Sequence, residues 1–447
     1  MPSCVERPRS ACALAGALAA MSALPGVVPI VHTALGCGGN LSGSFSLGAG
    51  YFGSGYCSGS SLPTSGITER EIVFGGADRL TEQIENTLDL IDAELFVVAT
   101  GCMTEIIGDD APSVVGEFEE AGKPVIAIST PSFLGDSYAG YEILLEGIFN
   151  YYLKPAPEEE KIPTLVNLFG IVPAYDPFFR GDLEEIARLL RALGLSVNTF
   201  FTPDQTYENI LSAPKAGLNI VLSRIWGVDF AENFQERHGT PYWITDLPIG
   251  PEATDAFVIE AAEKTGISNE NAKALIKNEN EIYYGYFERG ADVFMDSDFK
   301  FYSVVASNSN YAIPLTRYTE RELGWVGLDT YVTDQLKDEQ KEILKSAYLS
   351  GGPRAELLFE TDASQISKAI VKRRPENRGQ RYFDSVSPLF ILGSALEKKT
   401  AADRGAQQLT VSFPAFNRMI VDRGYAGYRG GLHLFEDIVG SLVYPKG

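Results

Sequence analysis

Short runs rich in valine, isoleucine, leucine and phenylalanine alternate with amphipathic stretches along almost the whole chain. Strands joined by helical crossovers pair in parallel, and helices then cover both faces of the sheet. The alternation therefore predicts an α/β fold with parallel sheets flanked by helices. With 447 residues the chain is too long for one hydrophobic core, so we expect several domains.

The pattern divides into three Rossmann-like units, with a proline- and charge-rich stretch at 155–163 as the best candidate linker. We expect domains at 1–160, 161–285 and 286–447. A second irregular stretch covers 240–251, and residues 38–66, rich in glycine, serine and tyrosine, are expected to form a long loop. The expected strands are 27–32, 95–99, 125–129, 164–171, 196–201, 219–223, 291–295, 301–306, 355–359, 389–392 and 408–413. The expected helices are 12–23, 76–91, 141–151, 182–193, 252–265, 269–281 and 432–442.

The net charge of −22 provides no basic surface for nucleic acid or for anionic lipid. The apolar run at 13–31 follows two arginines, as in a signal peptide, but Pro25 and Gly26 divide it. A helix, a turn and a buried strand explain that run better, and no other segment approaches the roughly 18–20 apolar residues that span a bilayer. Five dispersed cysteines fit a reducing compartment, so we expect a cytoplasmic protein.

Cys12, Cys37 and Cys102 each follow a short apolar run and lie beside glycine or alanine, and no cysteine follows Cys102. Cysteine thiolates on glycine-rich turns are typical ligands of iron–sulfur clusters, because glycine allows the backbone to approach the inorganic core. Cys37 and Cys102 come after expected strands, where parallel sheets bind ligands, so these two thiols should share one site. The alternative is three structural cysteines, since free cysteine is often simply buried.

These cysteines occur together with several longer strings, and the combination resembles the component 1 proteins of nitrogenase and of nitrogenase-like reductases. Near the cysteines the strings are ITEREIVFGG (67–76), CMTEIIGDD (102–110) and TPSFLG (130–135). Farther along they are GPEATD (250–255), FPAFNR (413–418) and GYRGG (427–431). The resemblance thus extends over nearly the whole chain.

The resemblance implies that Cys12, Cys37 and Cys102 bind half of a P-cluster-type 8Fe–7S cluster. A homologous catalytic α (D-like) subunit would bind the other half, in an α2β2 heterotetramer. Ser132 stands where β-type nitrogenase subunits carry a serine that can ligate the oxidised cluster; the alternative is a cap or turn residue. The chain has no Walker A string, so ATP would be hydrolysed by a separate ATP-dependent iron–sulfur reductase that donates the electrons.

The family's catalytic α-type subunits hold their substrate-reducing cofactor with a mid-chain cysteine and a late histidine. This chain lacks that cysteine, and its late His433 lies beyond the GYRGG string, so the resemblance implies a non-catalytic, β-type (K-like) subunit. The leading interpretation is a subunit similar to methylthio-alkane reductase, which cleaves C–S bonds. The alternatives are a β subunit of a genuine nitrogenase, a cofactor-assembly scaffold subunit, a tetrapyrrole reductase subunit, and a cluster-free binding module.

Other residues are more ambiguous. Cys4 and Cys57 lie outside the pattern and are expected to be structural or incidental, with a contact from Cys57 to the cluster as the alternative. Asp109 and Asp110 could bind a metal, but we expect them to cap the helix after Cys102. His32, at the end of an expected strand, is either a packed strand-end residue or a hydrogen-bond partner of the cluster ligands.

Overall fold

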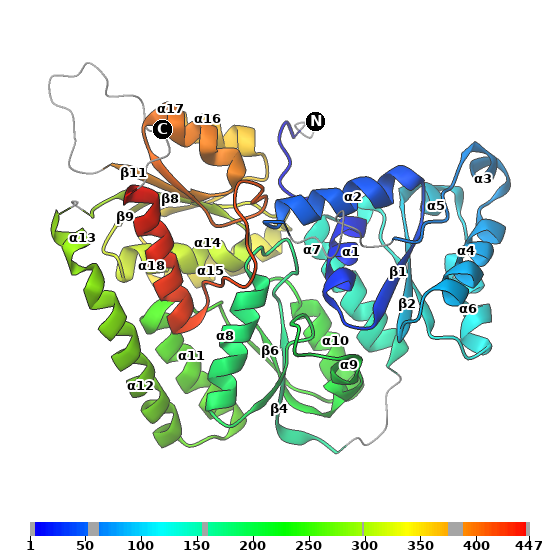
Figure 1. The fold of residues 1–447 in the computed structure, drawn as a ribbon, viewed down its shortest axis with the longest axis horizontal. Helices are drawn as coiled ribbons and strands as arrows, with labels where there is room; N and C mark the ends of the chain where they lie inside the picture. The colour runs from blue at the N-terminus through cyan, green and yellow to red at the C-terminus, as the bar shows by residue number, and fades with distance from the viewer. Residues whose placement is uncertain (1–4, 52–61, 154–159, 297–298, 374–387, 444–447) are drawn as a thin grey trace.

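The computed structural model describes residues 5–51, 62–153, 160–296, 299–373 and 388–443 (Figure 1). Within these residues the strands form three sheets, and every pair of neighbouring strands is parallel. Helices flank the sheets, so the predicted α/β class is correct. Each sheet takes its strands from one of the ranges 1–160, 161–285 and 286–447.

The first sheet has the order β1-β2-β3, from β1 (Val27–His32), β2 (Leu95–Thr100) and β3 (Val125–Ser129). Apolar side chains of α4 and α6 pack on one face, and those of α1 and α7 pack on the other. A sheet covered on both faces needs continuous apolar strands, which explains the uninterrupted runs in the sequence. The helices are α1 (Ala13–Ala23), α2 (Leu35–Gly48), α3 (Glu69–Phe74), α4 (Ala77–Leu90), α5 (Cys102–Ile107), α6 (Ala111–Glu120) and α7 (Ser137–Leu145), followed by a π-helical stretch, Glu146–Tyr152.

The second sheet has the order β5-β4-β6-β7. Its strands are β4 (Ile162–Phe169), β5 (Ser196–Asn198), β6 (Ala216–Val221) and β7 (Tyr242–Ile244). The short β7 lies inside the stretch expected to be irregular, and it forms because it pairs with β6 at the edge of the sheet. The helices are α8 (Phe179–Ala192), α9 (Tyr207–Ser212), α10 (Val228–His238), α11 (Gly250–Thr265) and α12 (Asn269–Phe287).

The third sheet has the order β10-β9-β8-β11-β12. Its strands are β8 (Tyr302–Ser307), β9 (Val326–Val332), β10 (Glu356–Phe359), β11 (Leu389–Gly393) and β12 (Gln407–Thr410). The remaining helices are α13 (Ala291–Asp296), α14 (Ser309–Arg321), α15 (Asp338–Gly351), α16 (Ala363–Arg373), α17 (Lys398–Arg404) and α18 (Gly427–Val443). No helix in the described ranges is long and apolar enough to cross a membrane.

The C-terminal helix α18 returns to the second unit and packs against α8, α11 and α12 (Figure 1, red). Its contact with α11 requires glycine, because a Cβ on Gly431 would lie 2.8 Å from the Cα of Gly250. The GPEATD and GYRGG strings, far apart in the sequence, therefore meet at the N-terminal ends of two packed helices.

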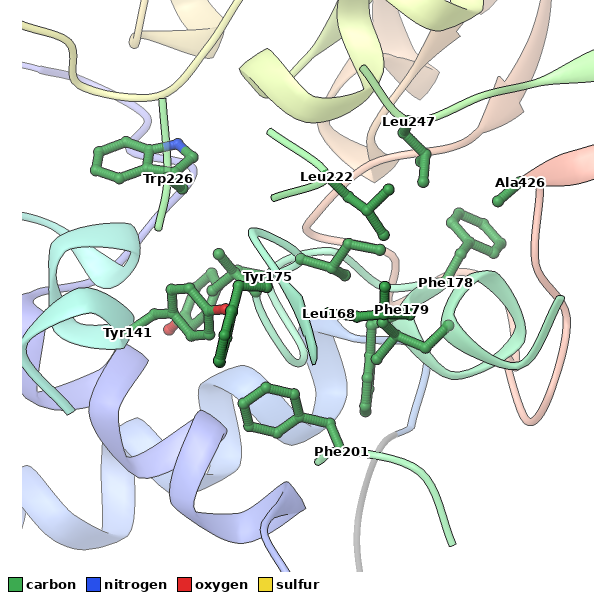
Figure 2. Close-up of a cluster of buried hydrophobic side chains, with 14 of the residues drawn as sticks. Tyr141, Leu168, Tyr175, Phe178, Phe179, Phe201, Leu222, Trp226, Leu247 and Ala426 are labelled. Atoms are coloured by element: carbon green, nitrogen blue, oxygen red, sulfur yellow. The ribbon is translucent and has the colours of Figure 1, made fainter. Parts of the chain in front are cut away.

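One apolar core joins the three units. Figure 2 shows part of it, with Tyr141, Tyr175 and Phe178 among the buried rings. A buried carboxylate, Asp182, borders this core and accepts hydrogen bonds from the backbone N–H of Ala426 at 2.7 Å and from the Tyr311 hydroxyl. Because α8 provides Asp182, α14 provides Tyr311 and Ala426 precedes α18, these bonds connect the second and third units.

Two further expectations about local structure are wrong, and strand β9 was not expected at all. Residues 291–295 form part of α13 instead of a strand, because Val293 and Phe294 pack inward while Met295 is exposed, as on a helix. The expected loop at 38–66 begins as helix α2 despite its glycines. Burial of Phe45, and a contact in which a Cβ on Gly48 would lie 2.4 Å from the Phe413 ring, show that tertiary packing outweighs poor helix propensity here.

Candidate functional site

All three predicted ligand cysteines lie at the N-terminal end of a helix. Cys12 is the N-cap residue of α1, Cys37 lies in the first turn of α2, and Cys102 is the first residue of α5. None of the three forms a disulfide, and each is partly exposed. The positive end of a helix dipole stabilises negative charge, so all three positions suit thiolate ligands. The sequence analysis expected Cys12 at the start of a helix, which the structure confirms; it placed Cys37 and Cys102 on turns after strands, where the structure starts helices instead.

The first sheet brings Cys37, Cys102 and Ser132 to one edge. β1, β2 and β3 end in register, with His32 opposite Thr100 and Thr100 opposite Ser129. The three candidate residues follow β1, β2 and β3 respectively. Because the strands are parallel neighbours, these residues come off the same carboxyl edge in the order of the sheet, where ligands of open parallel sheets bind.

Ser132 contacts Cys102 directly. The backbone N–H of Ser132 donates a hydrogen bond to the Cys102 Sγ at 3.1 Å, and the thiol lies 3.1 Å from the Ser132 Oγ, to which it donates. Hydrogen bonds to a ligand sulfur tune the charge and potential of a bound metal centre. These contacts place Ser132 beside Cys102, and its ligation of a cluster stays a prediction.

Cys12 is held beside the same loop by backbone pairing. It forms an isolated antiparallel bridge with Asp136, and the N–H of Ala13 donates to the carbonyl oxygen of Gly135 at 3.1 Å. The helices behind this bridge are in backbone contact, since a Cβ on Gly140 would lie 1.9 Å from the carbonyl oxygen of Ala13. The position of Cys12 therefore depends on tight packing of α1 against α7.

Asp136, which the sequence analysis missed, is a buried carboxylate that connects the Cys12 backbone, helix α7 and the third unit. It is buried, caps α7 by accepting from the N–H of Tyr138 at 3.0 Å, and accepts from the N–H of Gln335 at 3.3 Å in the third unit. Burial and the nearby Asp334 raise the pKa of Asp136 to about 6. An aspartate before serine at the start of an apolar helical pattern is a cap signal, and that signal could have identified it.

His32 and Asp109 form a buried pair next to the cysteines. The His32 Nε2 lies 3.2 Å from the Asp109 Oδ2, and its Nδ1 lies 2.9 Å from the Ser65 Oγ. Burial lowers the pKa of His32, although Asp109 opposes this shift. The other oxygen of Asp109 accepts from the N–H of Gly76 at 2.8 Å, so the pair joins the end of β1 to the loops before α4 and α6. His32 is thus a packed strand-end residue.

Asp110 caps α6 by accepting from the N–H of Ser113 at 3.1 Å, which confirms the capping expectation for this residue. Asp109 has the different role described above.

The other residues singled out in the sequence lie apart from the cysteines or outside the described ranges. His433 lies in α18, where its Nδ1 is 3.2 Å from the Gly424 carbonyl oxygen. Cys4 and Cys57 lie outside the described residues. Among the residues that are described, no group of three or more His, Cys, Asp and Glu side chains could hold a single metal ion.

Large apolar side chains are exposed around the carboxyl edge of the first sheet that carries Cys37, Cys102 and Ser132, which we call the cysteine edge. Phe74 at the end of α3 is 84% exposed, Ile106 in α5 is 75% exposed, and Phe133 next to Ser132 is 65% exposed. Leu35, two residues before Cys37, is 69% exposed. Such exposed apolar side chains, on elements that carry or adjoin the cysteines, are candidates for a contact with another protein.

The fold and the cysteine edge define an oxidoreductase subunit of nitrogenase type, and comparison with known proteins shows the family. Residues 12–443 match the family described as Nitrogenase component 1 type Oxidoreductase, and the chain belongs to it. It is a β-type, nitrogenase-like component 1 subunit. Membership of this family implies an iron–sulfur cofactor.

Two curated relatives and one solved structure illustrate the similarity. The chain is 24% identical to the nitrogenase molybdenum-iron protein beta chain of Frankia alni over 98% of this chain and 82% of the relative. It is 26% identical to the nitrogenase iron-molybdenum cofactor biosynthesis protein NifE of Clostridium pasteurianum, over 97% and 88% of the two chains. A solved structure titled "Nitrogenase Cp1 at pH 6.5" superposes with a TM-score of 0.78 at 20% identity, covering 99% of this chain and 94% of the other, which shows the shared fold.

Proposed function

We propose that this chain is the β-type subunit of a nitrogenase-like reductase similar to methylthio-alkane reductase, which cleaves C–S bonds of small thioethers. In this proposal Cys12, Cys37 and Cys102 hold half of a P-cluster-type 8Fe–7S cluster, and Ser132 contacts it beside Cys102. The observation that carries the cluster is the placement of three free cysteines at helix N-termini, with Cys102 and Cys12 in contact with the loop of Ser132 and Cys37 at the same edge of the first sheet.

The donor set fits a multi-iron cluster better than a single ion. Thiolates are the usual protein ligands of iron–sulfur clusters, and all three sulfurs are free. No described group of three metal-binding side chains could surround one metal ion, so the three cysteines would hold a larger centre together with ligands from a second subunit. Partly exposed cysteines at a sheet edge also leave room for ligands from a second subunit.

The proposed partner subunits would bind at the same edge of the first sheet. We propose that a homologous catalytic α (D-like) subunit covers the cysteines in an α2β2 heterotetramer, and that an ATP-dependent iron–sulfur reductase donates electrons to the complex. The exposed Leu35, Phe74, Ile106 and Phe133 around the cysteines support a protein contact here. We also propose a cytoplasmic location, which suits free thiols, and domains bounded at 1–160, 161–285 and 286–447.

The bound cluster would supply one-electron transfer between the reductase and the catalytic subunit. This chain's residues hold and tune that centre: the helix N-termini stabilise thiolate charge, and the N–H of Ser132 donates to the Cys102 sulfur. The buried His32–Asp109 pair holds the end of β1 in place, close to the start of α2 and of α5. The packing of α1 on α7 fixes Cys12.

The test is anaerobic co-purification with the α partner, followed by metal analysis and assays with the reductase and ATP. Iron without molybdenum or vanadium, with methanethiol and a hydrocarbon released from a methylthio-alkane, is the expected result. Molybdenum or vanadium together with ammonia formed from dinitrogen would instead identify a genuine nitrogenase. A colourless complex without iron would contradict the cluster altogether.

Two other functions have specific support. Beta chains of molybdenum-iron nitrogenase resemble this chain over almost its full length, which favours a genuine nitrogenase β subunit. The cofactor biosynthesis protein NifE resembles it over a similar span, which favours a cofactor-assembly scaffold. A scaffold would pass a cofactor to another protein and would show no substrate turnover of its own, so the assays above separate it from both reductases.

A further inference from the structure

Cys12 ends a segment that crosses from the third unit to the first. This segment, residues 6–12, which we call the N-terminal strap, lies beside the third unit in Figure 1 (dark blue). At its start, the backbone N–H groups of Glu6 and Arg7 donate to the carboxylate of Asp362 at 2.8 and 3.1 Å. Because Asp362 follows β10, the strap begins on the third unit.

A buried ion pair anchors the middle of the strap to the third sheet. The Arg9 guanidinium donates to both carboxylate oxygens of Glu397, to Oε2 at 3.1 Å, and to the Ser394 Oγ at 2.9 Å. The side chains of Arg9 and Glu397 are only 4% and 0% exposed. The end of β11 makes room for the pair, since a Cβ on Gly393 would lie 2.8 Å from the Glu397 Oε2. A bidentate contact of this kind fixes direction as well as distance.

Stability alone is a poor reason for this buried ion pair. Desolvation of the two charges offsets much of their attraction, and a well-packed apolar pair of similar volume is often as stable or more stable. One attested use of buried polar and ionic groups is to specify a single arrangement of the chain. The pair of Arg9 with Glu397 therefore points to a strap that must lie in one position.

The strap has little slack between Arg9 and Cys12. The N–H of Ala11 donates to the Ser137 Oγ at 3.0 Å, so the segment is held on the first unit as well as on the third. Three residues reach at most about 11 Å when fully extended. A displacement of Arg9 is therefore passed on to Cys12.

Cys12 depends on such an anchor more than the other two cysteines do. Cys37 follows β1 and Cys102 follows β2, and the register of these paired strands fixes both positions. Cys12 instead follows the strap, in whose described residues no strand lies, and begins α1 as its N-cap residue. Its position thus comes from the strap, from the bridge to Asp136 and from the packing of α1.

We infer that Arg9 is a positioning residue for Cys12: by pairing with Glu397 it holds the strap in the arrangement that puts Cys12 beside the loop of Ser132. The third unit thereby helps to build a site whose proposed ligands all belong to the first unit. The inference rests on the proposed function, since a cysteine needs a fixed position of this kind when it binds a cluster.

The test compares how fast iodoacetamide alkylates Cys12 and Cys37 in the same molecules, by mass spectrometry of the full chain prepared without iron. Arg9→Lys keeps the charge but loses the bidentate contact, and Arg9→Met combined with Glu397→Gln removes both charges. We expect the ratio of the Cys12 rate to the Cys37 rate to rise about tenfold in the double variant, because the strap opens locally. Arg9→Lys should raise it in the same direction.

Two control variants match these changes. Lys368→Met breaks an exposed ion pair with Glu6 on the same strap, and such surface pairs contribute little. Arg188→Lys removes a bidentate contact with Glu279 in the second unit, where the two bonds measure 2.7 and 2.8 Å. Both should leave the ratio of the two rates unchanged.

A second readout uses the iron-loaded complex. There the double variant should change the electron paramagnetic resonance spectrum of the cluster, because one of its proposed ligands is displaced, while Arg188→Lys should keep the wild-type spectrum. A general loss of stability would raise the alkylation rates of Cys12 and Cys37 together and leave their ratio unchanged.

The inference is overturned if the ratio stays at its wild-type value in both Arg9 variants, if the Cys37 rate rises as much as the Cys12 rate, or if either control raises the ratio equally. The alkylation experiment needs neither iron nor turnover. A complex without iron would therefore reject the proposed function while the ratio still tests the role of Arg9, so the two failures are distinguishable.

Discussion

The backbone N–H of Ser132 donates to the sulfur of Cys102 across 3.1 Å, and the two residues follow neighbouring strands of the first sheet. The side-chain oxygen of Ser132 lies at the same distance from that sulfur. Ser132 is thus placed to influence a metal-bound thiolate through its backbone, whether or not its hydroxyl ligates iron. The contact depends on the sheet register, which puts Thr100 opposite Ser129.

Ser132→Ala separates these two contributions. It keeps the N–H donor and removes the hydroxyl, so we expect the complex to retain its iron. Changes to hydrogen-bond partners of metal ligands cost about 10- to 100-fold in activity or affinity, so we expect reductase activity to fall by no more than this. Iron analysis and turnover of the anaerobic complex measure both. Loss of iron as large as in a cysteine variant would contradict this account.

The close contact between α1 and α7 predicts that a larger residue at Gly140 destabilises the protein. Gly140→Ala would place a Cβ 1.9 Å from the carbonyl oxygen of Ala13 and push the helices apart. We expect the free energy of unfolding to fall by about 1–3 kcal/mol or more, as for overpacked sites, together with reduced iron binding because Cys12 moves. Denaturant unfolding measures the stability.

Gly116→Ala in α6 is the matched control for that change. A Cβ there meets nothing within 4 Å, so the same substitution should stabilise the helix by about 0.5–1 kcal/mol. Equal effects of the two alanines on stability would show that close packing of α1 and α7 is not what requires glycine at 140.

The raised pKa of Glu142 predicts a pH dependence. The pKa rises from 4.5 to about 7 on folding, mainly through burial, so the folded state binds the proton more tightly than the unfolded state. The group's contribution to stability is therefore full below about pH 4.5 and is lost as the pH rises through about 7. The loss amounts to about 3 kcal/mol at 1.36 kcal/mol per pKa unit.

Glu142→Gln removes this titration and can keep the hydrogen bond from the N–H of Gly227. We expect the stability of the variant to fall less than that of wild type between pH 4.5 and 7.5, measured by denaturant unfolding at several pH values. Glu232→Gln on the surface of α10 should follow wild type. A Glu142→Gln curve parallel to wild type would refute the assigned shift.

Most strands buried on both faces were predictable from the sequence, because they need continuous apolar runs, although β9 inside the third sheet was missed. β1 and β3 were predicted with their correct bounds, at 27–32 and 125–129, and β2 to within one residue. Helix α2 was missed because its glycines argue against a helix, and only its packing against Phe413, more than 360 residues later, explains it. Contacts between such distant segments leave no local signal.

For the site, too, local sequence signals were predictive and contacts between distant segments were not. The cysteine spacing and neighbouring strings identified Cys12, Cys37, Cys102 and Ser132 as candidates, and the parallel order of β1, β2 and β3 explains why three of them share an edge. Asp136 was missed because its importance comes from contacts with Gln335 and the Cys12 backbone.

The most direct test of the central claim is the iron content of anaerobically purified complexes that carry Cys102→Ala or Cys37→Ala. Cys57→Ala, a change outside the proposed ligand set, is the control. The account predicts that the first two variants lose the iron–sulfur signal of the shared cluster and destabilise the heterotetramer, while Cys57→Ala keeps both. Full iron content and full activity in Cys102→Ala or Cys37→Ala would contradict the claim that this sheet edge holds the cluster.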